Sequence, residues 1–272
     1  MAVHERRVDK LHGLLADMKK GALVAFSGGV DSTVLLAEAH TILGDRCKAV
    51  TADSPSLPRA ALAWAAEFCR NRGISHRVVE THELDDPRYA ANTADRCFFC
   101  KSALFTAMQS IARSVDLPNL LYGAIADDLG DWRPGMTAAA DFGARAPLLD
   151  AGFTKKDVRM RARVLGLPGW DKPSSACLAS RFPTGMTVTL ENLRRVEAAE
   201  AVLHRLGFRQ CRVRLIGDSA RIEVERAALA RLMDAPTRKA ILTELKTLGF
   251  RFITLDLEGF RSGSLSPHSS GD

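Results

Sequence analysis

The sequence has no run of about 20 consecutive apolar residues, the length that an α-helix needs to cross a bilayer. Residues 1–7 mix acidic and basic side chains and do not form the apolar centre of a secretion signal. We therefore expect a cytoplasmic protein with no membrane partner. Aromatic residues make up only 6% of the chain. The C-terminal third shows neither a stripe of them nor zinc-knuckle spacing, so nucleic acid is not an expected partner.

The net charge and the number of cysteines exclude fewer classes of function than the missing membrane span and secretion signal do. The net charge of +6 suits an anionic partner, either tRNA or a nucleotide substrate, but a basic solvated surface would give the same value. The six cysteines stand in a chain without a secretion signal, so disulfides are a poor expectation. Metal binding or redox chemistry is the better hypothesis for them.

Helical and strand-like patterns alternate in the first third of the chain. A helix is expected at 8–18, and the continuous apolar run at 22–26 is typical of a strand buried on both faces of a parallel sheet. Further helices are expected at 32–42 and 58–72, and further strands at 48–52 and 76–80. This alternation predicts an α/β fold with a doubly wound, mostly parallel, Rossmann-like sheet.

The middle of the chain continues this domain as far as a linker. The patterns predict a helix at 95–114, a strand at 119–123, and a long functional loop in the Gly- and Asp-rich stretch 123–135. A helix at 154–165 opens with a threonine cap. The Pro-, Gly- and Ser-rich connection at 168–185 is where we place the domain boundary.

The C-terminal part predicts a smaller α+β domain. Helices are expected at 190–206 and 226–248, and strands at 211–215, 219–225 and 252–256, the first two strands joined as a hairpin by Gly217 and Asp218. The expected domains are therefore 1–183 and 184–262. Residues 263–272 form a Ser-, Gly- and Pro-rich tail that we expect to be disordered.

The strongest local signal is the hexapeptide SGGVDS that begins at Ser27, between a strand and a helix. Gly28 and Gly29 let the backbone turn tightly and bring its N–H groups to phosphate oxygens, while the helix start adds a positive dipole end. Ser32, like Ser27, can donate a hydroxyl hydrogen bond, and Asp31 can hold or orient a magnesium-bound phosphate. A Gly-Gly turn with a capping serine is the alternative, and it explains fewer of these residues.

Residues around the hexapeptide extend the predicted nucleotide site. No lysine stands where the Gly-Lys-Ser/Thr phosphate loop carries one, which argues against kinase or GTPase chemistry. Asp53 follows the second strand at the sheet edge where such folds bind nucleotides, although a role as a turn residue explains it equally well. Ala25 and Phe26, at the end of the first strand, complete the predicted ATP site.

Three of the six cysteines are candidate metal ligands. Cys97 and Cys100 are three residues apart at the front of a predicted helix, so both thiols face one side and the helix N-terminus favours their thiolates. Cys177 lies in the linker. Three converging thiolates suggest a 4Fe-4S cluster with one iron lacking a protein ligand, whereas a structural zinc would need a fourth ligand. The other three, which lie in apolar or helical surroundings, are expected to be core residues: Cys47, Cys69 and Cys211.

The hexapeptide resembles that of the PP-loop ATP pyrophosphatases, which adenylate a substrate oxygen for attack by nitrogen or sulfur. The rest of the chain resembles one family among them more specifically, the LarE-type ATP-dependent sulfur transferases. The likeness runs through blocks in both predicted domains: 27–32, 127–128, 132–135, 144–145, 177 with 180–183, 213–214, 220–223, 248–252 and 255–263. Members of this family replace oxygen by sulfur in the carboxylates of pyridinium biscarboxylic acid mononucleotide, a precursor of the nickel-pincer cofactor.

The resemblance implies a reaction and a set of roles. ATP and Mg²⁺ would be held by the hexapeptide, with Asp31 and Cys177 as catalytic residues and a small-molecule nucleotide as substrate. Some family members carry a single cysteine at the Cys177 position and surrender its sulfur. This chain adds Cys97 and Cys100 and so looks like the three-cysteine subset, in which a 4Fe-4S cluster carries the sulfide. The resemblance also implies a homo-oligomer and a sulfide donor such as a cysteine desulfurase.

Three arginines are candidates for the phosphate of the substrate. Arg212 and Arg214 alternate along one face of a predicted strand and could clamp a phosphate, although a solvated basic face fits the spacing equally well. Arg181, beside Cys177, is the third. In the predicted loop, Asp127 and Asp128 are either loop acids or metal ligands.

Three other functions use fewer of these features. The main alternative is a cluster-dependent tRNA thiolase, which a PP-loop, three cysteines and basic charge also suit, but the sequence shows no added RNA-binding module to support it. An iron-sulfur sensor that only binds nucleotide would leave the arginine-rich second domain unexplained. An amidating PP-loop synthetase would not need three placed thiolates.

Overall fold

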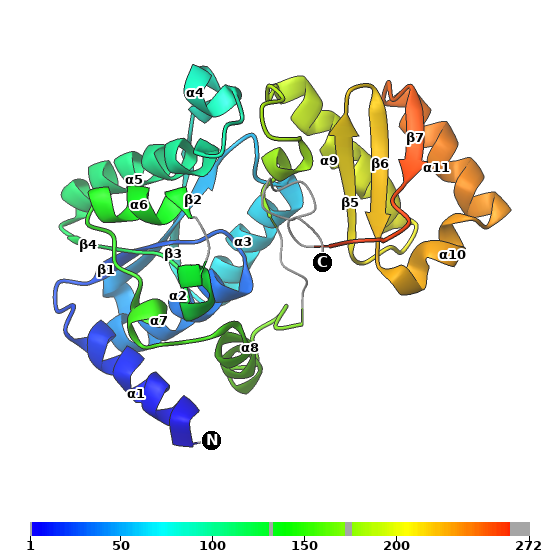
Figure 1. The fold of residues 1–272 in the computed structure, drawn as a ribbon. Helices are drawn as coiled ribbons and strands as arrows, with labels where there is room; N and C mark the ends of the chain where they lie inside the picture. The colour runs from blue at the N-terminus through cyan, green and yellow to red at the C-terminus, as the bar shows by residue number, and fades with distance from the viewer. Residues whose placement is uncertain (1, 131–132, 172–175, 262–272) are drawn as a thin grey trace. The chain divides into compact units, whose positions relative to one another are not determined.

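The computed structural model describes residues 2–130, 133–171 and 176–261, which fold as two compact units (Figure 1). Unit 1 comprises residues 2–83 and 95–171, and unit 2 comprises residues 84–94 and 176–261. The predicted disordered tail, 263–272, lies outside the described residues, as does Trp132. No helix in the described part of the chain is both long and apolar enough to span a membrane.

Unit 1 is built on a parallel sheet of four strands in the order β3-β2-β1-β4. The strands are β1 (Ala22–Ala25), β2 (Cys47–Asp53), β3 (Ser75–Glu80) and β4 (Asn119–Leu121). The chain builds outward from β1 to β2 and β3, and then returns to place β4 on the other side of β1. The carboxyl ends of β1 and β4 therefore flank the topological switch point, where open α/β sheets bind their ligands.

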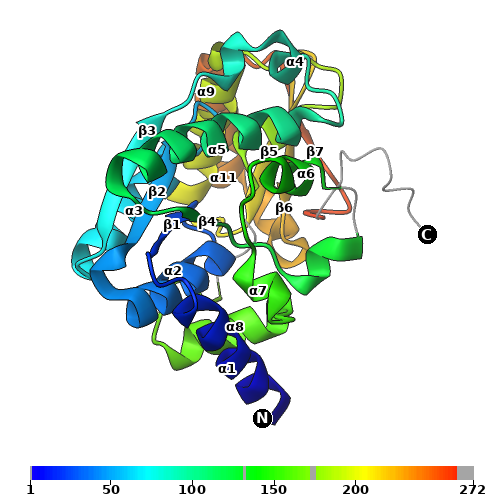
Figure 2. The same ribbon diagram turned by 90° about the vertical axis from the view of Figure 1, so that its left-hand side faces the viewer.

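Two apolar cores, one on each face of this sheet, confirm the predicted doubly wound architecture. Val24 of β1 packs with α1 (Ala2–Ala16), α2 (Val30–Leu43), α3 (Arg59–Asn71) and α8 (Lys155–Val164). Its neighbour Leu23 packs on the opposite face with α5 (Arg96–Val115) and α6 (Pro134–Asp141), which lie side by side in Figure 2. Successive strand residues point to opposite faces, so burial of both faces explains the continuous apolar run at 22–26.

Three short helices were not predicted from the sequence: α4 (Pro87–Ala90), α6, and α7 (Pro147–Asp150). Each has a proline at its first position, where the fixed φ suits a helix and the missing N–H has no helical partner to lose. The predicted loop at 123–135 is correspondingly shorter. It contains the 3₁₀ turn η3 (Ala126–Gly130), and it ends at Pro134, where α6 begins.

Unit 2 contains a mixed sheet in the order β5-β6-β7, formed by β5 (Cys211–Ile216), β6 (Ser219–Val224) and β7 (Phe252–Leu255). β5 and β6 form the expected antiparallel hairpin around Gly217 and Asp218, and β7 runs parallel to β6. Alongside the sheet are α9 (Leu190–Arg205), α10 (Leu229–Leu232) and α11 (Ala235–Thr247). This confirms the predicted α+β fold.

The single helix predicted at 226–248 is wrong. The segment divides into the 3₁₀ turn η5 (Arg226–Ala228), α10 and α11. Pro236 is the second residue of α11, two positions after the cap residue Asp234. A proline lacks the N–H that would continue a helix, and its ring clashes with the carbonyl four residues earlier, so the helix restarts there.

The two units divide earlier than the expected boundary at residue 183. Residues from Ala176 onward belong to unit 2, because Arg181 pairs with Glu200 of α9 at 2.9 Å and Arg214 of β5 donates to the Ser180 carbonyl at 2.8 Å. The segment 84–94 also belongs to unit 2, which the sequence did not indicate. Val188 donates its N–H to the Ala90 carbonyl at 2.8 Å, and backbone and side-chain hydrogen bonds of Asn92 add to this tie.

The N-terminus of α8 is anchored by a capping box. Thr154 accepts a hydrogen bond from the Asp157 N–H, and the Asp157 carboxylate accepts from the backbone N–H of Thr154. His4 and Arg7 of α1 also reach Asp157, the first at 3.2 Å. Burial alone would raise the pKa of Asp157, but the hydrogen bonds from Thr154 and His4 and the charge of Arg7 outweigh it and lower this pKa to about 2. The carboxylate therefore stabilises unit 1 in its ionised form.

Asp157→Asn should lower the free energy of unfolding at neutral pH by about 2 kcal/mol, because a pKa lowered from 3.8 to about 2 is worth roughly that much. A depressed pKa gives stability that is present above about pH 4 and is lost as the pH falls toward about 2. Denaturant unfolding at a series of pH values would measure it. The difference between wild type and variant should narrow below about pH 4, and a difference that stays constant as the pH falls would contradict this assignment.

Candidate active site

The hexapeptide SGGVDS leaves β1 at the switch point and enters α2, as predicted. Gly29 is the N-cap of α2, and in the described residues no side chain caps this end. The Ser32 hydroxyl donates to the Gly29 carbonyl at 3.0 Å and lies 3.3 Å from the Ser27 hydroxyl. The serines thus brace the turn from inside, while the backbone N–H groups of the first turn of α2 form an anion cradle.

Two glycines allow the backbone to approach this closely. Gly28 has φ +76°, and a Cβ there would lie 3.1 Å from the ring of Trp64. Gly123, two residues after the end of β4, lies against the first turn of α2. A Cβ on Gly123 would come within 2.8 Å of the Ser32 nitrogen and 3.1 Å of the Asp31 carbonyl carbon, both backbone atoms. A side chain at Gly28 would strain the left-handed backbone and press on Trp64, whereas one at Gly123 would collide with the backbone of α2, so the loop after β4 forms part of the wall of the cradle.

Asp31 meets a lysine that the sequence-based prediction missed. The ammonium of Lys155, the first residue of α8, lies 2.7 and 2.6 Å from the two Asp31 carboxylate oxygens. Burial raises the pKa of Asp31, the charge and hydrogen bonds of Lys155 offset part of the rise, and Asp128 adds to it. The Asp31 carboxylate, in the first turn of α2, is therefore paired with a cation that opposes the effect of its burial on the pKa.

The acids that follow β4 serve as local anchors. Asp128 accepts from the Ile125 N–H at 3.0 Å and pairs with Arg133 at 3.0 Å, and Asp127 accepts from the Lys155 N–H at 2.8 Å. These contacts make both residues loop acids. A role for either as a magnesium ligand stays a prediction.

Asp53 and the end of β1 form the other side of the predicted ATP site. The Asp53 carboxylate pairs with Arg59, whose other nitrogen donates to the Ser54 carbonyl at 2.6 Å. Ala25 and Phe26 are buried, and the Phe26 carbonyl accepts from the Thr51 hydroxyl at 2.6 Å. The structure thus brings the end of β1, the hexapeptide and Asp53 together along the carboxyl ends of β1 and β2. Binding of ATP by these residues stays a prediction.

The six cysteines divide as predicted into buried and accessible groups. Cys47, Cys69 and Cys211 are buried, and burial raises the pKa of each thiol to about 12. The three candidate ligands are not buried: Cys97, Cys100 and Cys177. Soft thiolate donors suit an iron-sulfur cluster, and these three are the accessible ones.

The three candidate ligand cysteines belong to two different units. Cys97 and Cys100 lie in the first two turns of α5, in unit 1, whereas Cys177 caps the 3₁₀ turn η4 (Leu178–Arg181) of unit 2. Across the described residues, no group of three or more His, Cys, Asp and Glu side chains lies close enough together to hold a metal ion. The 4Fe-4S cluster therefore stays a prediction that the chemistry of the accessible thiols fits.

An alkylating reagent should distinguish the two groups of cysteines. In the native, metal-free protein we expect Cys97, Cys100 and Cys177 to be labelled, because they are accessible. The buried thiols, with pKa values near 12, carry almost no thiolate at neutral pH and should react only after denaturant is added. Peptide mass spectrometry after brief labelling measures this. Native labelling of Cys69 as fast as Cys100 would contradict it.

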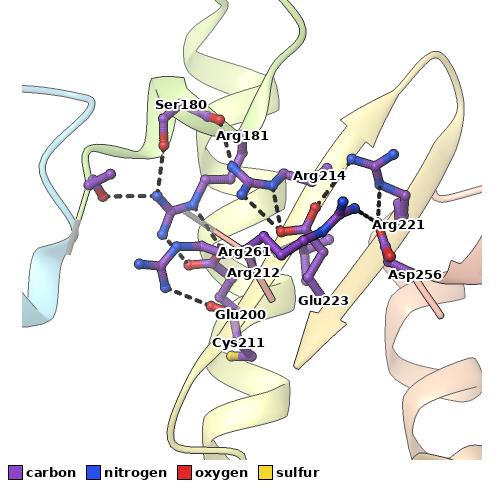
Figure 3. A network of polar contacts seen from close by, with 12 residues as sticks. Ser180, Arg181, Glu200, Cys211, Arg212, Arg214, Arg221, Glu223, Asp256 and Arg261 are labelled. Carbon is purple, nitrogen blue, oxygen red and sulfur yellow. Dashed lines mark hydrogen bonds and ion pairs between the residues drawn. The ribbon is translucent and has the colours of Figure 1, made fainter. Parts of the chain in front are cut away.

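The three arginines predicted to bind phosphate lie in one ionic network in unit 2 (Figure 3). Arg181 is 1% exposed, and its guanidinium forms two hydrogen bonds of 2.9 Å with Glu200. It also donates to the backbone carbonyls of Ala176 and Cys177, at 2.9 and 3.1 Å. Arg181 therefore fixes the backbone on which Cys177 sits.

Arg214 and Arg212 extend this network on the same face of β5. Arg214 donates to Glu223 of β6 at 3.0 and 2.9 Å, and Glu223 is fully buried. Arg212 stacks on the Phe260 ring at 5.1 Å. Burial, helped by the charge of Arg181, lowers the pKa of Arg212 to about 10, which still leaves it charged at neutral pH. A phosphate-binding role for these arginines stays a prediction, and their pairing with Glu200 and Glu223 was not foreseen.

Some relatives match nearly the full length of this chain, and others match only part of it. It is 40% identical to an uncharacterized protein of Synechocystis over 96% of this chain and 97% of that protein. It is 37% identical to the pyridinium-3,5-bisthiocarboxylic acid mononucleotide synthase of Lactiplantibacillus plantarum over 98% of this chain and 96% of the synthase. A more distant relative, one of the subunits of the glutamine-hydrolyzing GMP synthase of Pyrococcus horikoshii, is 24% identical over 60% of this chain and 56% of its own length. No family model matches the chain.

Proposed function

This chain belongs to the LarE-type sulfur transferase family, and from that premise we propose that it is the enzyme that adenylates pyridinium biscarboxylic acid mononucleotide with ATP and replaces carboxylate oxygen by sulfur. The extent of the similarity carries this proposal. Likeness to the pyridinium nucleotide synthase spans 98% of the chain and therefore both units, whereas likeness to the GMP synthase spans 60%. A shared nucleotide fold alone would favour amidation equally, and the greater extent of the likeness to the pyridinium nucleotide synthase is what favours sulfur transfer.

Adenylation explains why the reaction would use ATP. A carboxylate oxygen leaves badly, so the substrate carboxylate first attacks the α-phosphorus and expels pyrophosphate. Sulfide then attacks the acyl carbon of the acyl-adenylate, AMP leaves with the original oxygen, and a thiocarboxylate remains. The cradle at the start of α2 and Asp31 would hold the Mg-ATP phosphates, while Ala25, Phe26 and Asp53 would line the rest of the nucleotide site.

Cys97, Cys100 and Cys177 would hold the predicted 4Fe-4S cluster, since they are the accessible thiols. When bound, such a cluster supplies sulfide without loss of a protein sulfur atom. Arg181 donates hydrogen bonds to the carbonyls of Ala176 and Cys177, and these bonds fix the backbone of Cys177 where it leads into η4. We also propose a cytoplasmic homo-oligomer served by a sulfide donor such as a cysteine desulfurase.

Anaerobically purified protein incubated with ATP, Mg²⁺, sulfide and the pyridinium biscarboxylate nucleotide would test the proposal. Mass spectrometry should show oxygen replaced by sulfur, together with AMP and pyrophosphate. An ATP analogue with a methylene bridge between the α- and β-phosphorus serves as the control and should give no product. Unchanged nucleotide in the complete reaction would refute the proposal, and thiolation of added tRNA in the same assay would favour the tRNA thiolase instead.

A further inference from the structure

Arg145 extends the parallel sheet of unit 1 by one position beyond β4. Its backbone N–H donates to the Leu120 carbonyl at 2.8 Å, and its carbonyl accepts from the Tyr122 N–H at 3.0 Å. These hydrogen bonds place Arg145 opposite Leu121, in a parallel bridge at the end of β4. The Arg145 side chain therefore leaves the backbone in a fixed direction, and groups held on such rigid elements are placed more precisely than those on loops.

The register of this bridge puts the Arg145 side chain on the face of the sheet that α2 covers. Leu121 packs in the core on that face, whereas Ala144 packs against the core on the opposite face. Bridged residues share a face and successive residues alternate, so Arg145 lies on the face of Leu121, one strand spacing of about 4.8 Å away. Gly123 follows on the same side and lies against the first turn of α2, where a Cβ would meet the Ser32 nitrogen. Arg145 therefore stands beside the β4 wall of the anion cradle.

Arg145 is exposed, and within the part of the chain that the structure describes its guanidinium has no hydrogen-bond or ion-pair partner. An exposed arginine is ordinary on a protein surface, and its position is what distinguishes this one. Three other basic residues near the carboxyl ends of the sheet each pair with a carboxylate: Lys155 with Asp31, Arg59 with Asp53, and Arg133 with Asp128. Arg145 thus adds a positive charge beside the cradle that no acid among the described residues neutralises.

The substrate of the proposed reaction needs such a charge, because it carries two carboxylates and only one reacts at a time. Adenylation converts the reacting carboxylate into an ester, whereas the second carboxylate, on the same ring, stays anionic throughout. With the first carboxylate at the α-phosphorus, the second also lies in the site. An anion that leaves water needs a hydrogen-bonded counter-ion, and a planar guanidinium matches the two oxygens of a carboxylate.

The order of the strands makes Arg145 better placed for this acid than for ATP. Asp53 follows β2, on one side of β1, whereas Arg145 is bridged to β4, on the other side. An ATP molecule whose nucleoside lies toward Asp53 leaves the β4 side of its α-phosphorus open to the ring that carries the acids.

We infer that Arg145 binds the carboxylate of the pyridinium nucleotide that is not reacting, through a bidentate ion pair. The inference rests on the proposed function, because it takes the biscarboxylate nucleotide as the substrate. A thiocarboxylate keeps the negative charge, so the same contact would serve again when the second carboxylate reacts. Arg145 is thereby a specificity-determining residue, which favours a ring with two acids over a ring with one.

Pyrophosphate release by the full-length protein, supplied with ATP, Mg²⁺ and sulfide, would test this by comparing the biscarboxylate nucleotide with its analogue that lacks one carboxylate. The wild type should favour the biscarboxylate by about 10- to 100-fold in kcat/KM, the value of one or two charge-assisted hydrogen bonds. Arg145→Ala should lose this preference to within about threefold, through lower activity on the biscarboxylate alone, and should keep the KM for ATP. Arg145→Gln should give the same loss, whereas Arg145→Lys, which keeps the charge but not the planar fork, should retain part of the preference.

The matched control is Arg77→Ala, which removes an exposed arginine from β3 at the opposite edge of the sheet and should keep the wild-type preference. A wild type that uses both nucleotides equally well, or an Arg145→Ala protein that loses activity on both alike, would overturn the inference. A raised KM for ATP in that variant would also overturn it, since the residue would then serve ATP. Pyrophosphate release with the expected preference but without sulfur transfer would refute the proposed function and leave the inference standing. Wild-type protein that releases no pyrophosphate with either nucleotide would overturn both.

Discussion

Cys177→Ala is expected to abolish sulfur transfer, with product falling to the level of a reaction without ATP. Both of the proposed routes need this thiol, because it would either ligate the cluster or surrender its own sulfur. The assay is single- and multiple-turnover product formation measured by mass spectrometry. Cys69→Ala is the matched control because it removes a thiol that is buried in unit 1, and it should retain activity. Full activity of Cys177→Ala would remove this residue from the mechanism.

Cys97→Ala and Cys100→Ala decide between the two routes. If a cluster carries the sulfide, both variants should lose the iron and its visible absorbance, and the wild type should turn over more than once. If Cys177 is sacrificial, both variants should keep one turnover per chain, and the spent wild-type protein should weigh less by one hydrogen sulfide. Iron that persists in both variants would show that the ligand assignment is wrong.

Glu223→Ala is expected to destabilise unit 2 by about 3–5 kcal/mol, the typical cost of removing one partner of a buried ion pair and leaving the other charge uncompensated. Glu223 is fully buried and accepts from Arg214 at 2.9 Å and from Arg221 at 3.2 Å. The two arginines face each other across the hairpin, as Arg214 and Arg221 are register partners. Without the carboxylate they would repel each other in a site that excludes most water.

Denaturant unfolding curves would measure the loss. Glu225→Ala serves as the control, because Glu225 lies just beyond the end of β6 and is exposed, and it should change the free energy of unfolding by less than about 0.5 kcal/mol. Glu223→Gln should fall between the two, since it keeps hydrogen-bonding atoms and loses the charge. A Glu223→Ala protein as stable as the wild type would show that water or another acid compensates the arginines.

The elements that could be predicted from the sequence are those in which every residue favours the same local structure. The apolar run at 22–26 could be recognised as a strand because both of its faces are buried, and the hairpin at Gly217 and Asp218 could be recognised because a two-residue turn has a strong local signal. The helix at 226–248 was wrong because its apolar spacing continues across Pro236, and the proline outweighs the spacing. The spacing of apolar residues indicates which side of a helix is buried, whereas the point at which a helix ends can depend on a single residue.

The hexapeptide of the candidate site could be predicted from the sequence, but the contacts between residues far apart in the chain could not. The hexapeptide is six consecutive residues between a strand and a helix, so its place in the fold could be predicted directly, whereas its binding of phosphate stays a prediction. Lys155 lies 124 positions from Asp31, and Gly123 touches Ser32 through backbone atoms. The carboxylates that meet Arg181 and Arg214 come from another helix and another strand. No local pattern records such pairs, although a lysine at the start of a helix was a usable sign.

Residues 84–94 belong to unit 2, although they lie within the sequence of unit 1, and this affects how the chain can fold during its synthesis. This segment emerges before α5 is made, yet the groups that bind it, around Pro183, Gly185 and Val188, are translated about a hundred residues later. During synthesis the segment therefore lacks these hydrogen-bond partners until residue 188 has been made. A fragment that begins at residue 176 would lack it for good, so cutting the gene at the linker should yield an incomplete C-terminal unit.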